Sequence, residues 1–434
     1  MNIKQVAINL ISQVDKGAYS NIALNETFKI LDINSKEKAF MTEIFYGVLR
    51  NKKFLDYIIE KNTKEIKKEW IRNLLRISIY QITFMDSDNK GIVWEATELA
   101  KKYSIAISKF INGTLRNYLR NKDSELKNLA DEKNYEVLYS IPKWFYNILE
   151  KQYRNENLKQ AITSLKKVPY LSVRVNKLKY TEKEFEEFLK EKDIQIIKKV
   201  DTVYYINSGL IINSEEFKTG KIIAQDASSY LAAKNLEVIP NELVLDICAA
   251  PGGKTAVLAE NMENRGEIIA IDIHQHKIKL IDTNMKKLGI DIVKATVMDA
   301  RNVNKQGRKF DKILVDVPCS GYGVIRKKPE ILYSKNRENI EELAKLQLEI
   351  LNSAADILKD GGELIYSTCT ITDEENTNNI EKFLKEREEF KVEKLYIPKN
   401  VSGDYDSLGG FCINYKEEIM DNFYIIKLKK GEKC

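Results

Sequence analysis

The stretch LVLDICAAPGGKT, Leu243 to Thr255, decides the fold class of this 434-residue chain. A run of apolar residues gives way to small residues and then to a helical pattern. The apolar run is typical of a buried strand. Small residues allow a ligand to approach the backbone at the N-terminus of the following helix. The stretch therefore predicts a strand, a ligand-binding turn and a helix of an α/β sheet.

The sequence beyond this stretch repeats the alternation of strand and helix. Further strands are predicted over 267–273, 293–299, 312–318, 362–369 and 423–429, and helices over 254–262, 275–288, 340–358 and 374–387. This rhythm is typical of a doubly wound parallel sheet with helices on both faces. Ligands of such sheets bind at the carboxyl ends of the strands, so the side chains there are candidates for a site.

Three domains are expected along the chain. Residues 1–130 contain no proline and carry apolar residues at helical spacing, which predicts an all-α domain. The polar run 122–134 suggests a linker. Residues 131–220 predict a small α+β connector with a capping box at Thr181 and Glu184. Residues 221–434 then form the Rossmann-like α/β domain.

Composition disfavours several classes of protein. No run approaches the roughly 20 apolar residues of a membrane span, and the charged N-terminus is unlike a signal peptide. We expect a cytoplasmic monomer without membrane contact. None of the cysteines at 248, 319, 369, 412 and 434 lies in a C-x-x-C pair, so no metal site is expected. The only histidines, His274 and His276, are expected at a solvated helix start, which disfavours Ser-His-Asp and Cys-His catalysis.

Positive charge is concentrated in the first domain. Residues 1–130 hold 22 Lys/Arg and 15 Asp/Glu, a net charge of +7, and the rest of the chain has a net charge of −1. A clustered basic excess suits binding to a phosphate backbone. Solvated helices can carry the same charge, so charge alone leaves both interpretations open.

The turn that begins at Cys248 leaves two kinds of cofactor open. Gly253-Lys254-Thr255 fits the end of a phosphate-binding P-loop, but Cys248 stands where that motif needs its first glycine. Asp272 and Asp299 end the second and third strands, where they could contact the ribose and the adenine of a nucleoside cofactor. With Asp246 they would repel a triphosphate, which favours an adenosyl cofactor. Singly, each Asp could also cap a turn.

Two thiols follow neighbouring strands. Cys319 lies in VDVPCSGYG and Cys369 in IYSTCTIT, so both should emerge at the ligand-binding edge. A lone cysteine is usually an inert buried residue, but methylation of cytosine gives a pair a chemical reason. A thiolate that adds to carbon 6 makes carbon 5 nucleophilic enough to take a methyl group, and a second group can assist the release. Asp316 could hydrogen-bond the Watson–Crick edge of a flipped base.

A basic tetrapeptide, RKKP, follows the glycine-containing loop after Cys319. Its cations, Arg326, Lys327 and Lys328, could hold RNA phosphates at the mouth of the site. A solvated basic loop is the alternative.

Three motifs in one order, DICAAPGGKT, DVPCSGYG and YSTC, make residues 135–434 resemble the Sun/NOL/NOP family of RNA 5-methylcytosine methyltransferases. EIFYGVLRNKKFLDYII, NLLRISIYQ and INGTLRNYLR are similar to the NusB-like RNA-binding domain of small-subunit ribosomal RNA methyltransferases in this family. The resemblance implies S-adenosylmethionine as cofactor and a cytosine of small-subunit (16S) ribosomal RNA as substrate.

The resemblance also implies residue roles, which the residues alone do not rank. Cys369 becomes the nucleophile and Cys319 the residue that assists product release, with Asp316 beside them. The implied cofactor contacts are Cys248, Ala249, Ala250, Pro251, Gly252, Gly253, Lys254, Asp272, Asp299 and Asp316.

The sequence departs from the family pattern in three places. Asp421-Asn422-Phe423-Tyr424 replaces the usual Asp-Gly-Phe-Phe, a Pro-His is missing between Gly409 and Glu418, and DNKGIVWEATELAKKY replaces an Ala-Val-Asn-Glu run. The alternative class is a non-catalytic RNA-binding factor with an inactive methyltransferase fold. The intact Cys319, Cys369 and Asp316 argue against it.

Overall fold

The computed structural model describes residues 2–131, 134–334 and 336–432. It contains two compact units, one of residues 1–166 with 327–336 and the other of residues 167–326 with 337–434. Cys434 lies outside the described residues. Within the described ranges, no helix combines the length and the apolar character needed to cross a membrane.

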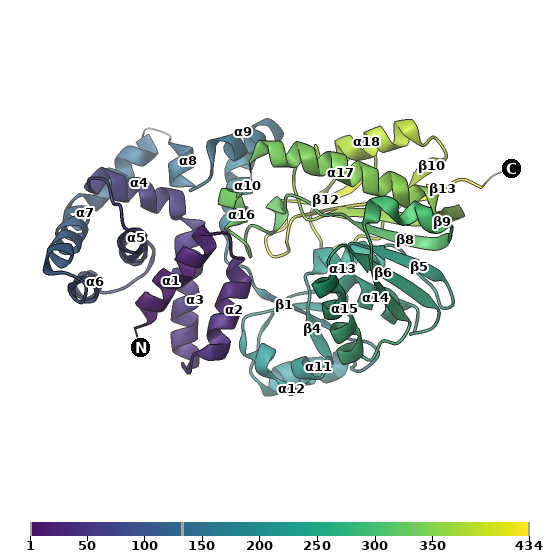
Figure 1. Ribbon diagram of the computed structural model, residues 1–434, viewed down its shortest axis with the longest axis horizontal. Helices are drawn as coiled ribbons and strands as arrows, with labels where there is room; N and C mark the ends of the chain where they lie inside the picture. The colour runs from purple at the N-terminus through teal and green to yellow at the C-terminus, as the bar shows by residue number, and fades with distance from the viewer. Residues whose placement is uncertain (1, 132–133, 335, 433–434) are drawn as a thin grey trace. The chain divides into compact units, whose positions relative to one another are not determined.

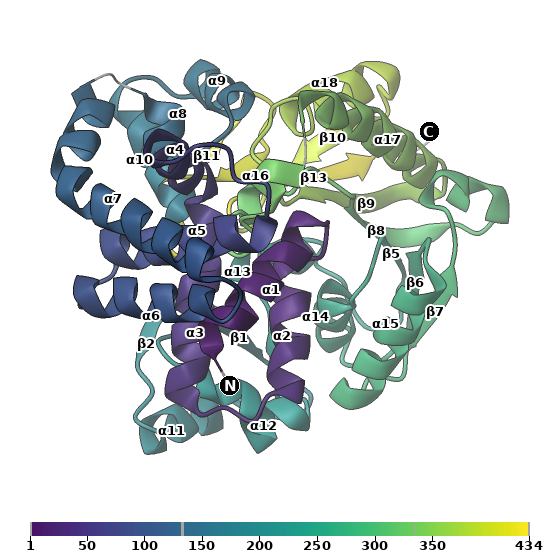
Figure 2. The ribbon, with the colours of Figure 1, turned by 60° about the vertical axis from the view of Figure 1, so that its left-hand side comes forward.

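The first unit is built of helices. They are α1 (Ile3–Asp15), α2 (Ser20–Ile30), α3 (Ser35–Arg50), α4 (Lys52–Asn62), α5 (Glu69–Phe84), α6 (Asn89–Lys101), α7 (Ile105–Asp131), α8 (Tyr135–Leu138), α9 (Lys143–Gln152), α10 (Glu156–Lys166) and α16 (Ile331–Ser334). Helix α5 is buried on all sides over 73–82, with α1, α3, α4, α6 and α7 packed against it (Figure 2). A helix that is apolar around most of its circumference belongs at the centre of a bundle.

Helix α7 runs through most of the expected linker. The prediction of a linker over 122–134 is wrong for residues 122–131, which continue the helix. Leu129 is 1% exposed and Leu126 packs against the same helical core. Because this apolar pair stands among charged residues, the average composition of the run hides its helical periodicity.

The second unit begins with a small antiparallel sheet in the order β2-β3-β1-β4. Its elements are β1 (Leu171–Val175), α11 (Glu182–Glu191), β2 (Ile196–Val200), β3 (Val203–Ile206), the short helices η1 (Leu210–Asn213) and α12 (Glu215–Lys218), and β4 (Ile222–Ala224). The capping box predicted at Thr181 and Glu184 is confirmed at the start of α11. This is the α+β connector.

A nine-stranded sheet forms the rest of this unit, in the order β11-β12-β13-β9-β8-β5-β6-β7, with β10 on β13. Its strands are β5 (Leu243–Ile247), β6 (Glu267–Asp272), β7 (Val293–Val297), β8 (Phe310–Asp316), β9 (Leu358–Thr368), β10 (Phe390–Glu393), β11 (Asp404–Tyr405), β12 (Phe411–Ile413) and β13 (Phe423–Lys430). Strands β5 to β9 are parallel. The last predicted strand, β13, differs from the expectation because it runs antiparallel to β9.

Helices cover both faces of this sheet. Helices α13 (Ala227–Lys234), α14 (Gly253–Asn261) and α15 (Gln275–Leu288) pack on one face, and α17 (Arg337–Asp356) and α18 (Thr377–Glu386) on the other (Figure 1). The predicted fold class, a helical N-terminal part, an α+β connector and a Rossmann-like domain, is confirmed. From β5 the chain adds β6 and then β7 on one side of that strand. It then crosses over and adds β8 and β9 on the other side of β5. The carboxyl end of β5 is therefore the expected ligand position.

Candidate active site

The turn between β5 and α14 is shaped by left-handed backbone. Cys248 has φ +60° and Gly252 φ +97°. The positive φ favours glycine at position 252, and a Cβ there would lie 2.9 Å from Cε of Met285, the mobile end of a flexible side chain. The turn delivers the N-terminus of α14 to the edge of the sheet. Small residues there leave backbone N–H groups accessible to a ligand.

Asp246, at the end of β5, fastens this turn. Its Oδ2 accepts the Thr255 hydroxyl at 2.6 Å, whereas its Oδ1 is buried with no hydrogen-bond partner among the described residues. Burial raises the pKa of Asp246 to about 7, against the opposing effect of the Thr255 bond. Asp246 therefore joins the first turn of α14 to the central strand.

The predicted ribose ligand, Asp272, ends β6 beside this turn. It is 4% exposed, and its Oδ1 accepts the backbone N–H of His274 at 3.2 Å. Burial and the charges of Asp316, Asp272 and Asp246, in that order, raise the pKa of the Cys248 thiol to about 12. The three carboxylates thus act on one point of the turn, opposed there by Lys277, which lies 3.4 Å from Asp272.

Asp299 caps a short helix, which is one of the two roles considered for it from the sequence. It is the N-cap of the short helix η2 (Ala300–Gln306), and its carboxylate pairs with Arg301 at 2.6 Å. The pKa of Asp299 is lowered mainly by this hydrogen-bonded guanidinium. Both carboxylate oxygens are bound by Arg301, so adenine contact stays a prediction for this residue. His274 and His276 are exposed at the start of α15, as predicted.

Asp316 and Lys254 form an ion pair at the carboxyl edge of β8. The Nζ of Lys254 lies 2.7 Å from Oδ2 of Asp316, and the Ser367 hydroxyl donates to Oδ1 at 2.7 Å. Burial disfavours the ammonium of Lys254, but the Asp316 carboxylate outweighs this effect and the pKa of Lys254 is raised. Lys254 also lies over the ring of Phe423, 5.4 Å from its centroid. The pair fixes a cation beside the predicted catalytic residues.

The two predicted thiols are in contact. Sγ of Cys319 and Sγ of Cys369 are 2.9 Å apart, too far for a disulfide bond of about 2.05 Å. The backbone N–H of Cys369 points to Sγ of Cys319 at 3.3 Å. The hydrogen bond to Cys369 and burial raise the pKa of Cys319 well above its usual value. Either sulfur can be the donor of this contact, and the raised pKa of Cys319 favours Cys319 as the one that carries the proton.

A buried carboxylate that sequence reasoning missed organises both thiol loops. Glu375 is fully buried and accepts from Ser320 N (2.8 Å) and Ser320 Oγ (2.5 Å). It also accepts from Thr372 Oγ1 at 2.7 Å and from Gln347 Nε2 at 2.9 Å. Ser320 follows Cys319, and its hydroxyl lies 2.6 Å from that of Thr370, which follows Cys369. The sequence offered only an acidic residue six positions after the STC motif.

Gly323 locks the loop after Cys319 to the end of β9. Its N–H donates to the carbonyl of Cys369 at 2.9 Å, and its carbonyl accepts from Asn422 N at 3.1 Å. A Cβ on Gly323 would lie 2.0 Å from the Asn422 carbonyl. The unusual Asp421-Asn422-Phe423-Tyr424 segment therefore supplies backbone to the thiol loop. The extra hydroxyl of Tyr424 donates to Asp406 at 2.8 Å.

The structure argues against the predicted phosphate contact of Arg326. The side chain is 1% exposed, and its guanidinium donates to the carbonyls of Glu417, Glu418 and Met420 at 2.7–3.0 Å. The prediction failed because these acceptors are backbone groups, which leave no sign in the sequence. The following Lys327 and Lys328 are partly exposed, and their RNA contacts stay predictions. No group of three metal-binding side chains occurs within the described ranges.

These features define an α/β domain of the nucleoside-cofactor-binding, methyltransferase type, with paired thiols at the ligand edge. The model "16S rRNA methyltransferase RsmB/F" matches residues 233–429, the NusB family model matches 1–120, and the ferredoxin-like domain model of RsmF/B-like methyltransferases matches 141–215. The chain belongs to the RsmB/F family of 16S rRNA methyltransferases, which confirms the resemblance seen in the motifs.

Relatives cover nearly the whole chain. The probable ribosomal RNA small subunit methyltransferase B of Bacillus subtilis (strain 168) is 34% identical over 99% of both chains. Ribosomal RNA small subunit methyltransferase B of Shewanella oneidensis is 32% identical over 99% of this chain and 100% of its own. The crystal structure of PH0851 superposes with a TM-score of 0.84 at 30% identity, covering 99% of both chains.

Proposed function

We propose that this protein transfers a methyl group from S-adenosylmethionine to carbon 5 of a cytosine in small-subunit ribosomal RNA. The observation that carries the proposal is the 2.9 Å contact between Cys319 and Cys369 at the ligand-binding edge of the sheet. Membership of the RsmB/F family supports the RNA substrate. The basic excess of residues 1–130 supports a role for the helical part in holding that RNA.

The residues of the turn suit a cofactor that is cationic and lacks phosphates. The carboxylates of Asp246, Asp272 and Asp316 all act on Cys248 and would repel a triphosphate. Residues Cys248 to Lys254 would hold the cofactor against α14, with Asp272 accepting the ribose hydroxyls. S-adenosylmethionine, when bound, supplies an electrophilic methyl group on a positively charged sulfur. The P-loop alternative is therefore disfavoured by charge as well as by the missing glycine.

The two thiols have different roles in the steps on the base. Cys369 adds as a thiolate to carbon 6 of the base, and the new C–S bond makes carbon 5 nucleophilic. After carbon 5 has been methylated, its proton leaves to solvent, the C–S bond breaks and the electron pair returns to sulfur. Cys319 stays protonated and donates its S–H to the Cys369 sulfur as the C–S bond breaks, which stabilises the departing thiolate.

The pair of Lys254 and Asp316 sets the electrostatics of this step. The ammonium of Lys254 acts favourably on the charge of Cys369 as well as on Asp316, so it stabilises the attacking thiolate. Asp316, held in place by Lys254 and Ser367, accepts a hydrogen bond from the exocyclic amine of the flipped cytosine. Glu375 acts indirectly, by fixing the loops that carry the thiols.

The test is methyl transfer to an unmodified transcript of 16S rRNA. The full chain is incubated with S-adenosylmethionine carrying a labelled methyl group, and modified positions are mapped by bisulfite sequencing, which distinguishes 5-methylcytosine. We expect label at one or a few cytosines. Label on another atom or base, or transfer that survives loss of both thiols, would overturn the proposal.

A further inference from the structure

A cavity in the α/β unit lies away from the thiols. It has a volume of about 1020 Å³ and is lined from the connector by Lys177 and Thr202, and from the large domain by Tyr230, Lys234, Asn261 and Tyr396. Lys234 ends α13, and Asn261 ends α14. Both therefore stand at the amino ends of the strands, whereas the thiols stand at the carboxyl ends. A strand of five residues separates these edges by about 16 Å.

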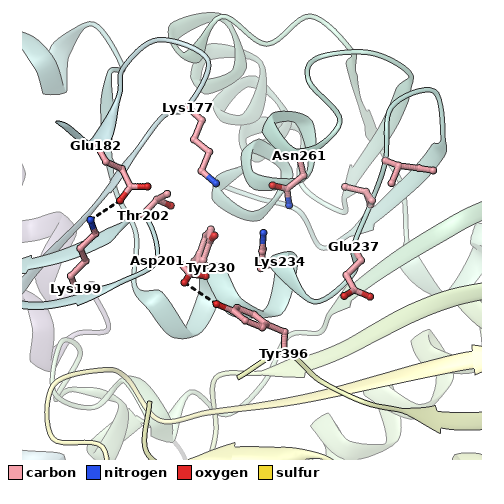
Figure 3. Close-up of a pocket in the computed structure, with 12 residues that line it drawn as sticks. Lys177, Glu182, Lys199, Asp201, Thr202, Tyr230, Lys234, Glu237, Asn261 and Tyr396 are labelled. Carbon is pink, nitrogen blue, oxygen red and sulfur yellow. Dashed lines mark hydrogen bonds and ion pairs between the residues drawn. The ribbon is translucent and has the colours of Figure 1, made fainter. Parts of the chain in front are cut away.

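The polar side chains of this cavity converge. Figure 3 shows Lys177, Lys234 and Asn261 with their polar ends directed into the same space. Neither ammonium has an ion-pair or hydrogen-bond partner among the described residues. The cavity therefore presents two cations and an amide that no part of the described chain uses.

The acidic residues around the cavity are already engaged. Glu182 pairs with Lys199 at 2.7 Å, and Glu237 pairs with Lys427. Asp201 accepts the hydroxyl of Tyr396 at 3.1 Å. Asp201 keeps its negative charge, so the lining charges without an ion-pair partner among the described residues are those of Lys177, Lys234 and Asp201, and the two ammonium groups outnumber the single carboxylate. An anion with several acceptor oxygens, such as a phosphodiester, matches two ammonium groups and an amide.

We propose that this cavity binds a backbone phosphate of the RNA substrate, outside the catalytic cleft. The inference rests on the proposed function for the identity of the RNA. The volume, at the upper limit of small-molecule pockets, leaves room for a nucleotide around the phosphate, and Tyr396 offers a partly exposed ring (47%) for a base to stack on. A contact on both sides of the cavity lets the RNA bridge the connector and the catalytic domain.

The test compares RNA binding by the full chain and by the double variant Lys177→Gln/Lys234→Gln. Affinity for a 16S rRNA transcript is measured by filter binding at several salt concentrations. We expect several-fold weaker binding and a slope of log K against log salt that is smaller by about 1, the effect of losing one phosphate contact. The control variant Lys190→Gln/Lys382→Gln removes the same charge from exposed helix positions and should change the slope less.

Two outcomes would overturn the proposal. One is an unchanged slope and affinity in the double variant. The other is seen by calorimetry: wild type binds inorganic phosphate or a mononucleotide, the double variant does not, and both bind RNA with the same affinity. That result would assign the cavity to a small ligand. Methyl transfer at saturating RNA is measured in parallel. Its absence in the wild type would contradict the proposed function, and the binding comparison would still decide the phosphate site.

Discussion

Ser320 donates both its backbone N–H and its hydroxyl to the carboxylate of Glu375, at 2.8 and 2.5 Å. Ser320 follows Cys319 directly, and Glu375 lies in the segment that follows Cys369. The fully buried carboxylate therefore joins two loops that are 50 residues apart in the chain. A buried carboxylate is costly unless its oxygens are hydrogen-bonded, and here four donors bind it. This link is one of the contacts that hold the two thiol loops together.

Replacing Glu375 with Gln should slow methyl transfer while leaving cofactor affinity almost unchanged. Glutamine has the shape of glutamate but no charge. Its NH2 group would replace one carboxylate oxygen and face donors that this oxygen now accepts from. Each charge-assisted hydrogen bond contributes about 1.5–3 kcal/mol, so we expect a rate reduction of about 10- to 100-fold. The measurements are kcat and the dissociation constant of S-adenosylmethionine.

The pH–rate profile separates positioning from simple loss of stability. Glu375 is one of the charges that raise the pKa of Cys319, so Glu375→Gln should shift the alkaline limb of the profile to lower pH. The neighbouring Glu374→Gln changes the charge equally and should leave both rate and profile intact. Equal effects of the two substitutions would contradict a specific role for Glu375.

Cys369→Ala should abolish methyl transfer, because it removes the thiol that adds to carbon 6 in the proposed mechanism and leaves only Cys319, whose raised pKa keeps it protonated. Labelled methyl incorporation into the 16S rRNA transcript is the measurement. Cys412→Ala is the matched control, since Cys412 packs in the hydrophobic core and burial raises its pKa to about 12. Residual transfer by the Cys369 variant at the wild-type rate would exclude it as the nucleophile.

Cys319→Ala should trap the protein on its RNA. Addition by Cys369 still occurs, but the departing thiolate loses the S–H donor that lies 2.9 Å away. We expect a protein–RNA adduct that survives denaturing gel electrophoresis, together with a strongly reduced turnover. The double variant Cys319→Ala/Cys369→Ala should form none. Activity lost without an adduct would contradict the proposed role of Cys319 in release.

The sequence predicted those parts of the site that depend on strand ends. Periodicity placed the ends of β5, β6, β8 and β9, and parallel strands bring such ends to one edge whatever the side-chain details. For this reason Cys319 and Cys369 could be expected to lie near one another. Motif spacing alone could not show that their sulfurs touch, or that Gly323 binds the carbonyl of Cys369.

The features that sequence reasoning missed depend on long-range partners. Arg326 resembled a solvated cation until its carbonyl acceptors, more than 90 residues away, were known. Glu375 has no motif of its own, and its function comes from donors on three separate segments. The helical continuation of α7 was hidden because charge dominated the composition of 122–131. In each case tertiary contacts outweigh the local signal.

Arg326→Gln should destabilise the protein without changing how RNA binding depends on salt. The variant loses charge-assisted hydrogen bonds to three carbonyls and leaves some of these acceptors buried. We expect a thermal midpoint several degrees lower, in line with a loss of about 2 kcal/mol or more. The salt slope of RNA binding should stay unchanged. A slope smaller by about 1, with an unaltered midpoint, would restore the phosphate contact first predicted for this residue.

Asp246→Asn should change how stability depends on pH. Burial raises the pKa of Asp246 to about 7 in the folded chain, against about 3.9 when unfolded. The folded state therefore holds the proton more tightly, so the wild-type contribution is complete below about pH 4 and is lost as the pH rises to 7. The asparagine variant does not titrate and still accepts the Thr255 hydroxyl. Relative to wild type, its stability should increase across this range by at most about 1.4 kcal/mol per pH unit.

Thermal midpoints of both chains between pH 5 and 8 measure this difference, with the exposed Asp282→Asn as control. We expect the midpoint of the Asp246 variant to rise relative to wild type as the pH increases toward 7, and the difference to be constant above it. The control should follow wild type throughout. Parallel curves for wild type and the Asp246 variant would mean that the carboxylate is stabilised as an anion, and the buried Oδ1 would then need a partner in solution. Repeating the series with saturating S-adenosylmethionine shows whether the bound cofactor alters the titration of this carboxylate.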